Sequence, residues 1–430
     1  MDFTEQHPAF LKTAGGPDWL CELRNTGIAR FTELGFPTGR DENWRFTDVS
    51  PIRQTAFTPA VPGAFDVTAL LQDSGCDDWP GHRLVFVDGI FMPDQSDVGA
   101  LPAGVYLGGL ADILAATPEA LQPHLGMGAA VNGNSFTALN TGYIRDGAAI
   151  LVPDNIDDSI TVNVWYVSTG TTTNAVTQPR TLIVVGDNSN LTITENYLGT
   201  GDACYFTNAV TEVTLAENAV IDHTKMQLES ETAYHIADMH VHAARNSRFK
   251  SHAITAGGEI TRNTINAQLD DENIECTLNG LYLGHGRQLI DTHTCIEHAH
   301  PNCNSYEIYK GILDDKARGV FNGRIHVWQG AQKTDALQTN RALLLSDDAR
   351  VNTKPELEIY ADDVRCTHGA TIGQLDEAGL FYLRARGIDT KTARGILTYA
   401  FACEAVTDIE SKPVRDTIER FLIQRYRQLQ

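Results

Sequence analysis

Short turn signals divide the middle of the chain at nearly constant intervals, and this spacing constrains the fold more than any other feature. Between residues 136 and 373, Thr, Val, Ile and Asn recur in short alternating runs, which favour β-strands. An interval of about fifteen residues fits one strand of five to eight residues and its turn. The turn centres are Asn188, Asp202, Asn218, Thr232, Asn246, Gly258, Asn273, Gly286, Asn302, Lys316, Gln332, Asp348 and Asp363.

Two such intervals make one coil of a β-solenoid, in which each strand pairs with its equivalent in the next coil. Inward side chains then stack, so a position three residues after every second turn should form an apolar column. Most of the residues at these positions are apolar, and the sequence therefore predicts a mainly β solenoid core. The expected column is Leu191, Ile221, Phe249, Cys276, Leu289, Gly319, Val351 and, after a half-step, Cys366.

The chain changes character on either side of this core. We expect a mostly helical N-terminal region over residues 1–135, the β core over 136–373 and a helical C-terminal domain over 374–430. In the first region, the spacing of apolar residues predicts a helix from Leu20 to Leu34 that Gly35 ends. Further expectations are a hairpin over residues 84–91, turning at Asp88 and Gly89, and a short helix over residues 107–121.

Two helices are expected in the C-terminal domain. The first is capped by Asp389 or Thr390, and the second is capped by Ser411 with Pro413 in its first turn. Their apolar faces follow helical spacing. The first face holds Ala393, Ile396, Leu397, Ala400 and Phe401, and the second holds Val414, Ile418, Phe421 and Leu422.

The charge balance excludes several classes of partner. A net charge of −22 argues against a protein that binds nucleic-acid phosphates or an anionic membrane surface. No run approaches the ~18 apolar residues of a spanning helix, and the first ten residues do not resemble a secretory signal. The 8 cysteines lie far apart without a C-x-x-C pair, which favours reduced thiols and a cytoplasmic location.

The densest group of potential metal ligands is His293, Cys295, His298, His300 and Cys303. Imidazole and thiol groups suit zinc or an iron–sulfur centre. On a strand, however, His293 and Cys295 share one face while His298 and His300 share the other. A polar solenoid strand that runs into a turn is therefore the preferred interpretation, and a stand-alone metal protein is the alternative.

Other polar groups also favour structural roles. His240 and His242 share a strand face, and for them and His235 we expect a solvated face or interior hydrogen bonds. Paired acids could catalyse sugar cleavage, but their recurrence at turns favours local backbone hydrogen bonding. These pairs begin at Asp157, Asp270, Asp314, Asp347 and Asp362.

Cys366 and His368 stand apart because they lie on the last strand of the stack. The expected register places Cys366 in the inward column, and strand alternation places His368 on the same side. A final coil leaves an unpaired backbone edge that must be capped or paired with a partner. These two side chains are therefore candidate interface ligands, whereas a core thiol and a hydrogen-bonded histidine are the structural alternative.

Several strings resemble the SufB/SufD family of the SUF iron–sulfur cluster assembly system, and within it the SufD branch. The resemblance covers essentially the whole chain and is most specific from about residue 280 to 410. It rests on residues 42–47 (ENWRFT), 136–140 (FTALN), 301–305 (PNCNS), 309–313 (YKGIL), 319–323 (GVFNG), 363–371 (DVRCTHGAT) and 380–388 (LFYLRARGI).

The resemblance implies a right-handed parallel β-helix with helical domains at both ends, and a non-catalytic scaffold. It implies pairing with SufB through the end of the β-helix, with His368 at the interface as a metal ligand beside Cys366. A nascent iron–sulfur cluster would be transient and shared with SufB, and no cofactor is expected in the isolated chain. The ATPase SufC would dock on the C-terminal helices, with candidate contacts at Phe381, Tyr382, Arg384, Arg386, Ile388 and Phe401.

One departure separates the two branches of the family. SufB carries a cluster-site cysteine before the strand that matches residues 343–346, and Asn340 stands there in this chain. We therefore expect the chain to need SufB for efficient cluster assembly. Whether it forms a homodimer alone, and whether a flavin binds the complex, stay open. A β-helix polysaccharide lyase or hydrolase is the alternative function, which would place acids along a groove on the rod.

Overall fold

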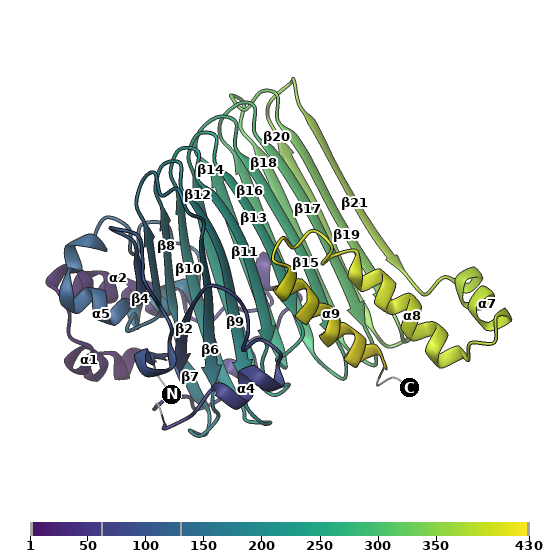
Figure 1. Cartoon of the computed structure of the whole chain (residues 1–430), viewed down its shortest axis with the longest axis horizontal. Helices are drawn as coiled ribbons and strands as arrows, with labels where there is room; N and C mark the ends of the chain where they lie inside the picture. The colour runs from purple at the N-terminus through teal and green to yellow at the C-terminus, as the bar shows by residue number, and fades with distance from the viewer. Residues whose placement is uncertain (1–2, 62, 130, 428–430) are drawn as a thin grey trace.

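The computed structural model describes residues 3–61, 63–129 and 131–427. Figure 1 shows a rod of stacked strands with helices at its N-terminal end and further helices beside its C-terminal half. A mainly β solenoid flanked by helices was predicted, and the structure confirms it.

Two parallel sheets form the rod, because successive strands alternate between them and pair with the strand two places further on. We call them the even sheet and the odd sheet after the labels of their last strands. The even sheet contains β5 (Ala148–Val152), β8 (Arg180–Val185), β10 (Tyr205–Leu215), β12 (Tyr234–Ala243), β14 (Ile260–Leu269), β16 (Leu289–His298), β18 (Arg318–Val327) and β20 (Arg350–Ile359). The odd sheet contains β6 (Ile160–Ser168), β9 (Asn190–Gly199), β11 (Val220–Leu228), β13 (Arg248–Thr255), β15 (Glu275–Gly284), β17 (Asn304–Leu313), β19 (Asp335–Leu344) and β21 (Arg365–Gly373).

The turns between these strands confirm the predicted spacing. Several turns contain an asparagine with positive φ, which this side chain tolerates because it can hydrogen-bond locally. Neighbouring coils are also tied at the turns, since Asn218 Nδ2 donates to Asn188 Oδ1 at 2.8 Å. The asparagines with positive φ are Asn155, Asn174, Asn188, Asn218, Asn246, Asn273 and Asn302.

The predicted inward column is correct only in part. Leu191, Ile221, Phe249, Cys276 and Cys366 do lie in one register of the odd sheet, which Ser305 and Ala336 complete. The other three predicted members belong to the even sheet: Gly319 pairs with Val351, and Leu289 is one position out of their register. The coils differ in length, so a fixed count of residues drifts from one sheet to the other.

The N-terminal region mixes helices with short strands. The predicted helix is α2 (Asp18–Leu34), which ends before Gly35, and the predicted hairpin is β2 (His82–Val87) with β3 (Ile90–Phe91). Because β2 also pairs with β6, this hairpin covers the first coil of the odd sheet. The helices are α1 (Phe3–Ala14), α2 (Asp18–Leu34), α3 (Ser50–Gln54), α4 (Thr68–Asp73), α5 (Leu110–Ala116) and α6 (Ser135–Gly142), with 3-10 turns η1 (Glu42–Trp44), η2 (Pro93–Gln95) and η3 (Pro118–Ala120). The short strands are β1 (Thr58–Pro59), β2 (His82–Val87), β3 (Ile90–Phe91), β4 (Tyr106–Gly109) and β7 (Ala175–Thr177).

Two local expectations were wrong. The helix expected over residues 107–121 begins only at Leu110, because Leu107 lies in β4 and pairs with Ile150 of β5. Residues 135–142, where strands were expected to begin, form α6. The side chain of Asn134 accepts the N–H groups of Phe136 and Thr137 and so caps this helix. Most of α6 is buried, so no polar face marks its helical period.

Up to residue 427, three helices follow the last strand, α7 (Glu377–Ala385), α8 (Thr390–Cys403) and α9 (Lys412–Arg427). Asp389 caps α8 by accepting the N–H of Thr392, and the predicted stripe of α9 is buried at Val414, Ile418 and Leu422. The predicted face of α8 was wrong in part: Ala393 is buried, but Ile396 and Ala400 are exposed.

Besides Ala393, the buried residues of α8 are Thr398 and Ala402. Thr398 was not predicted to be buried because it is polar. Its hydroxyl donates to the carbonyl of Arg394, so the hydroxyl has a hydrogen-bond partner in its buried position. The buried side chains of α8 and α9 pack with outward residues of the odd sheet, among them Met226, Ile254 and Leu281. No helix in the described ranges is long and apolar enough to cross a membrane.

Candidate functional site

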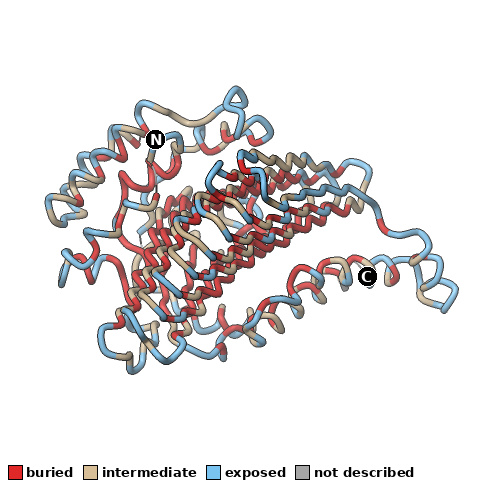
Figure 2. Tube along the Cα trace, turned by 90° about the horizontal axis from the view of Figure 1, so that it is seen from above, coloured by how far each residue is buried: buried red, intermediate tan, exposed pale blue. Residues whose placement is uncertain are grey.

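The rod ends in an exposed coil made of β20 and β21. β20 pairs only with β18 and β21 only with β19, so the other edge of each strand has no partner among the described strands. Figure 2 shows buried residues along the stacked strands and exposed residues along the final strand. Such an edge is a template for pairing with another chain, which makes this coil the candidate site.

Cys366 points inward in this final coil. Its register partner is Ala336, and it packs beside the apolar cluster that includes Ile325 and Val327. Burial raises the pKa of the Cys366 thiol, and the nearby charge of Asp335 adds to the rise. The free chain therefore holds this residue mainly as a neutral thiol, and a metal or a cationic partner would be needed to stabilise the thiolate.

His368 lies on the same side of β21 and is exposed. Its register partner is Gln338, which is fully buried in β19. No hydrogen bond of the His368 side chain occurs within the part of the chain that the structure describes. Its imidazole is therefore accessible from the end of the rod, as an interface ligand must be.

Asn340 stands at the position that the sequence comparison with SufB matched to a cluster-site cysteine. It is buried in β19, pairs with Ala370 of the final coil, and donates to Tyr282 Oη at 3.4 Å and to the Tyr309 carbonyl at 3.3 Å. The position therefore points into the rod one coil below the exposed end. An amide there offers no thiolate to iron.

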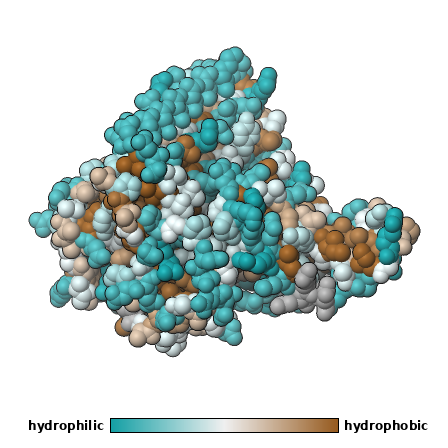
Figure 3. All heavy atoms as spheres, viewed as in Figure 1, coloured by the Kyte–Doolittle hydropathy of each residue, from teal (hydrophilic) through white to brown (hydrophobic). Residues whose placement is uncertain are grey.

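The predicted contacts on the C-terminal helices divide into two groups. Phe381 and Tyr382 are exposed by 76% and 58%, and Arg384 and Arg386 are exposed as well. Ile388 and Phe401 instead pack against the chain's own core, where Phe401 lies 4.3 Å from the ammonium of Lys310. Figure 3 shows hydrophobic residues gathered on these helices. Exposed apolar area of this kind is typical of a docking surface.

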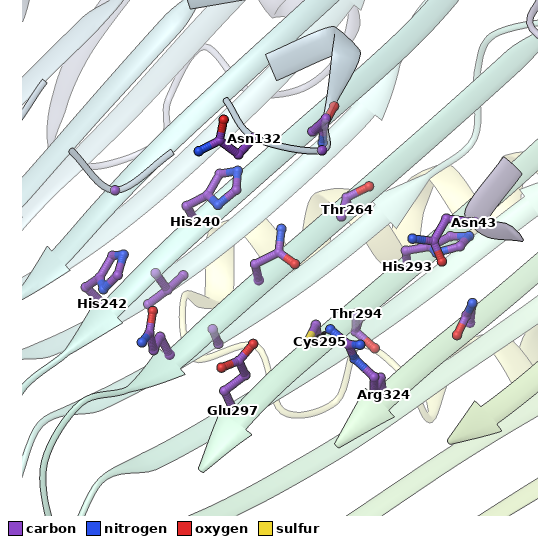
Figure 4. Close-up of a pocket in the computed structure, with 18 of the residues that line it drawn as sticks. Asn43, Asn132, His240, His242, Thr264, His293, Thr294, Cys295, Glu297 and Arg324 are labelled. Carbon is purple, nitrogen blue, oxygen red and sulfur yellow. Dashed lines mark hydrogen bonds between the residues drawn. The ribbon is translucent and has the colours of Figure 1, made fainter. Parts of the chain in front are cut away.

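A polar groove of about 570 Å³ lies on the outer face of the even sheet. Figure 4 shows His240 and His242 on one strand and His293, Cys295 and Glu297 on another, with Asn43 and Asn132 entering from N-terminal segments. Arg324 donates to Cys295 Sγ at 3.3 Å. Burial raises the pKa of Cys295, and Arg324 offsets part of that rise.

The structure separates the ligands of the His and Cys string, so the stand-alone metal site is wrong. His293 and Cys295 face this outer groove, whereas His298 faces the interior and bonds Ser305 at 2.9 Å. Burial lowers the pKa of His298 to about 4. Cys303 is buried at a turn, where its thiol donates to the carbonyl of Asp271 at 3.2 Å. No group of three or more metal-ligating side chains is found within the described residues.

The remaining histidines and acid pairs have the predicted structural roles. His240 and His242 share the outer face of β12, while His235 is buried among interior hydrogen-bonding groups. The acid pairs lie in turns, where Asp314 accepts the N–H of Asp315 and Asp271 accepts that of Glu272. These acids do not line the groove on the even sheet.

Sequence reasoning missed a charged network inside the rod. Glu195, His223, Lys225, Glu229 and His235 are all buried between the first coils. Two of the contacts are His223 Nε2 to Glu195 Oε2 at 3.1 Å and His235 Nδ1 to Glu229 Oε2 at 2.7 Å. Burial lowers the pKa of Lys225 to about 8, although the surrounding carboxylates oppose this effect. The signal was present, since Glu195 shares strand parity with the core residues Leu191 and Ile193.

Two family models cover almost the whole chain. The first, described as SUF system FeS cluster assembly, SufBD core domain, matches residues 167–401, and the SufBD protein N-terminal region matches residues 2–164. A SufBD family iron–sulfur cluster assembly protein of Synechocystis is 35% identical over 406 residues, which are 92% of this chain and 89% of the relative. The iron–sulfur cluster assembly protein SufD of Escherichia coli is 32% identical over 397 residues, or 91% and 89% of the two chains. SufD of Bacillus subtilis is 29% identical over 439 residues, or 96% and 94%.

Proposed function

This chain belongs to the SufBD family of SUF iron–sulfur cluster assembly proteins, and we propose that it is a non-catalytic scaffold subunit of a SufBCD complex. Its β-solenoid pairs with SufB at the exposed final coil. A nascent iron–sulfur cluster forms there as cargo shared between the two subunits. His368 supplies an imidazole ligand and Cys366 a neighbouring thiol.

The observation that carries this proposal is the open coil itself. β21 is exposed along almost its whole length, whereas β19 beneath it alternates between buried and exposed positions. Apolar side chains are left at this end, with Ile359 exposed by 39% and Ile372 by 49%. A second β-solenoid that pairs with these strands would bury the apolar residues and complete the backbone hydrogen bonds.

Thiolate and imidazole ligands suit iron, and the chemistry of the final coil fits a transient cluster. Because Asn340 supplies no thiol, the chain depends on SufB for the remaining ligands. The rod is stiff, so it can hold ligands at a fixed position across an interface. When SufB is absent, the exposed strand also permits two copies of this chain to pair through the same edge.

The second partner is the ATPase SufC, which docks on the C-terminal helices. The exposed side chains of Phe381, Tyr382 and Ile396 give these helices an apolar surface, with the Arg386 guanidinium 5.1 Å from the centre of the Tyr382 ring. Interfaces of this kind use aromatic anchors. We place the protein in the cytoplasm, in agreement with its 8 cysteines and with free thiols at every one of them.

Affinity purification from native lysate tests the scaffold role. We expect the full chain to retain SufB and an ATPase subunit, and the three-component complex to build and transfer a cluster that the chain alone does not. The same preparation is incubated with neutral and acidic polysaccharides. Turnover of a polysaccharide, together with no affinity for SufB or the ATPase, would reject the proposal in favour of a β-helix lyase or hydrolase.

A further inference from the structure

A buried hydrogen-bond acceptor lies directly beneath the final coil without a donor. Gln338 of β19 is fully buried, and its Nε2 donates to Glu307 Oε2 at 2.8 Å. Its Oε1 has no hydrogen-bond partner in the described part of the chain. An unpaired buried carbonyl oxygen costs free energy, so a donor is expected to reach it.

The orientation of this amide is determined by its neighbours. Glu307 is fully buried, and its other oxygen, Oε1, accepts from Thr294 Oγ1 at 2.5 Å. Above the pKa of Glu307 its carboxylate only accepts hydrogen bonds, so the NH₂ group of Gln338 faces Glu307 and the carbonyl oxygen is left over.

A glycine in the opposite sheet makes room for the amide. A Cβ atom on Gly323 would lie 2.3 Å from Gln338 Nε2 and 2.8 Å from Gln338 Cδ. The amide of Gln338 therefore packs against bare backbone of β18 while it bonds Glu307. Two independent contacts, one in each sheet, hold the side chain in one position.

The strand register makes His368 the candidate donor for the free oxygen, although the two side chains are not hydrogen-bonded in this structure. Glu307, Gln338 and His368 are register partners in three successive coils and occupy one column of the odd sheet. The bond between Glu307 and Gln338 shows that side chains in this column reach from one coil to the next. A neutral imidazole can donate from one ring nitrogen while the other keeps its lone pair.

We propose that Gln338 is a positioning residue for His368, with Gln338 Oε1 accepting an N–H of the imidazole and so selecting one tautomer. The other ring nitrogen then faces the open end of the rod with its lone pair free for iron. Histidines that bind metals commonly donate their second nitrogen to a carbonyl or carboxylate in this way. The role of the iron rests on the proposed function, whereas the hydrogen bond does not.

The test is nitrogen NMR on the full chain labelled with ¹⁵N-histidine. Two-bond ¹H–¹⁵N spectra distinguish the two neutral tautomers, and the His368→Ala variant identifies the signal of His368. In the wild type we expect one tautomer to dominate at a pH where the ring is neutral. In Gln338→Leu and Gln338→Met we expect the mixture of tautomers found for an imidazole in water.

Gly323→Ala provides a variant that keeps Gln338 but displaces its amide, and it should shift the tautomer ratio in the same direction. Gly330→Ala is the matched control, because nothing lies within 4 Å of the added Cβ. Far-UV circular dichroism checks that each variant is folded. If Gln338→Leu does not fold, Gln338→Met and Gly323→Ala decide the question.

A tautomer ratio that is the same in the wild type, in both Gln338 variants and in Gly323→Ala overturns the inference. Cluster transfer by the assembled complex is measured separately on the same variants. Normal transfer by His368→Ala would reject the iron-binding role of His368 and leave the hydrogen bond standing. An unchanged tautomer ratio together with impaired transfer by His368→Ala would reject the hydrogen bond and leave the proposed function standing.

Discussion

Lys225 Nζ lies 3.0 Å from His235 Nε2 inside the rod, and both residues are buried. An ammonium group can only donate, so Nε2 of His235 must accept and cannot carry a proton. The proton of the ring therefore lies on Nδ1, which is 2.7 Å from Glu229 Oε2. A buried triad of ammonium, neutral imidazole and carboxylate follows from this single distance.

We predict that His235 stays neutral, with its proton on Nδ1, through the pH range in which exposed histidines titrate. Burial lowers the pKa of His235, and the charge of Lys225 lowers it further, against the opposite effect of Glu229. Nitrogen NMR of the histidine rings measures the protonated nitrogen directly. A second proton on His235 at pH 6 would contradict the arrangement.

A buried ion pair attaches the N-terminal region to the rod. Arg180 contacts Glu212 at 2.6 Å, and Glu212 also accepts the N–H groups of Gly126, Gly128 and Ala129. Burial alone would raise the pKa of Glu212, but Arg180 and these N–H groups outweigh that effect and lower it. The carboxylate is therefore ionised in its buried site.

We predict that Arg180→Met lowers the free energy of unfolding by about 3–5 kcal/mol, since it leaves the carboxylate buried without its partner. Urea unfolding at neutral pH measures the change. Arg30→Met is the control, because Arg30 pairs with Glu33 at the surface, where such pairs contribute less than about 1 kcal/mol. Equal losses in the two variants would contradict the prediction.

The turns of this fold could be predicted from the sequence, because asparagine and glycine report left-handed backbone directly. Asn246 and Asn302 mark turns by their own conformation, with φ of 58° and 62°. The open final coil followed from the same spacing, which placed Cys366 and His368 on the last strand and on its inward side.

The interior could not be predicted in the same way, because it depends on which residues meet across coils of unequal length. Glu307, Gln338 and His368 share a column only through the register of three strands. Strand alternation identifies residues that share a face, but it does not identify their neighbours in the next coil. The partners of Lys225 were missed for the same reason.

Glu307 should make the stability of the protein depend on pH. Burial raises the pKa of Glu307 to about 7, against an ordinary value of 4.5. The folded chain then binds more protons than the unfolded chain between these values, so the contribution of this site to stability falls as the pH rises through this window. The pKa difference corresponds to about 3 kcal/mol.

We predict that Glu307→Gln removes this pH dependence while it preserves the size of the side chain beside Gln338. The variant should therefore gain stability relative to the wild type by about 3 kcal/mol between pH 4.5 and pH 8. Urea unfolding of both proteins at several pH values measures the gain. A stability difference that is constant across the range would show that Glu307 ionises normally.

His368→Ala should separate cluster delivery from folding. The side chain is exposed in the final coil, so we expect its removal to cost only the bond to Gln338, about 1 kcal/mol of unfolding free energy, and to leave assembly with SufB and SufC normal. Transfer of a cluster to an apo acceptor protein should fall strongly. Thr367→Ala, on the opposite face of the same strand, is the matched control and should transfer normally. Normal transfer by His368→Ala would remove the imidazole from the mechanism.

The docking surface on the C-terminal helices can be tested with exposed residues. Phe381 is exposed by 76% and Ile396 by 41%, so replacing each with Ser should leave the stability within about 0.5 kcal/mol. If these side chains anchor SufC, the double variant Phe381→Ser with Ile396→Ser should bind it about tenfold or more weakly, as loss of buried anchors does. Titration calorimetry with purified SufC measures the affinity.

The control for this experiment is Met127→Ser. Met127 is exposed by 73% but lies in the N-terminal region, beside the polar groove of the even sheet. The substitution Met127→Ser also removes exposed apolar area. An effect of general surface hydrophobicity on SufC binding would therefore appear in Met127→Ser as well as in the double variant. SufC binding that is weakened only by the double variant supports docking on α7 and α8. Equal affinities for the wild type and the double variant would place the ATPase elsewhere.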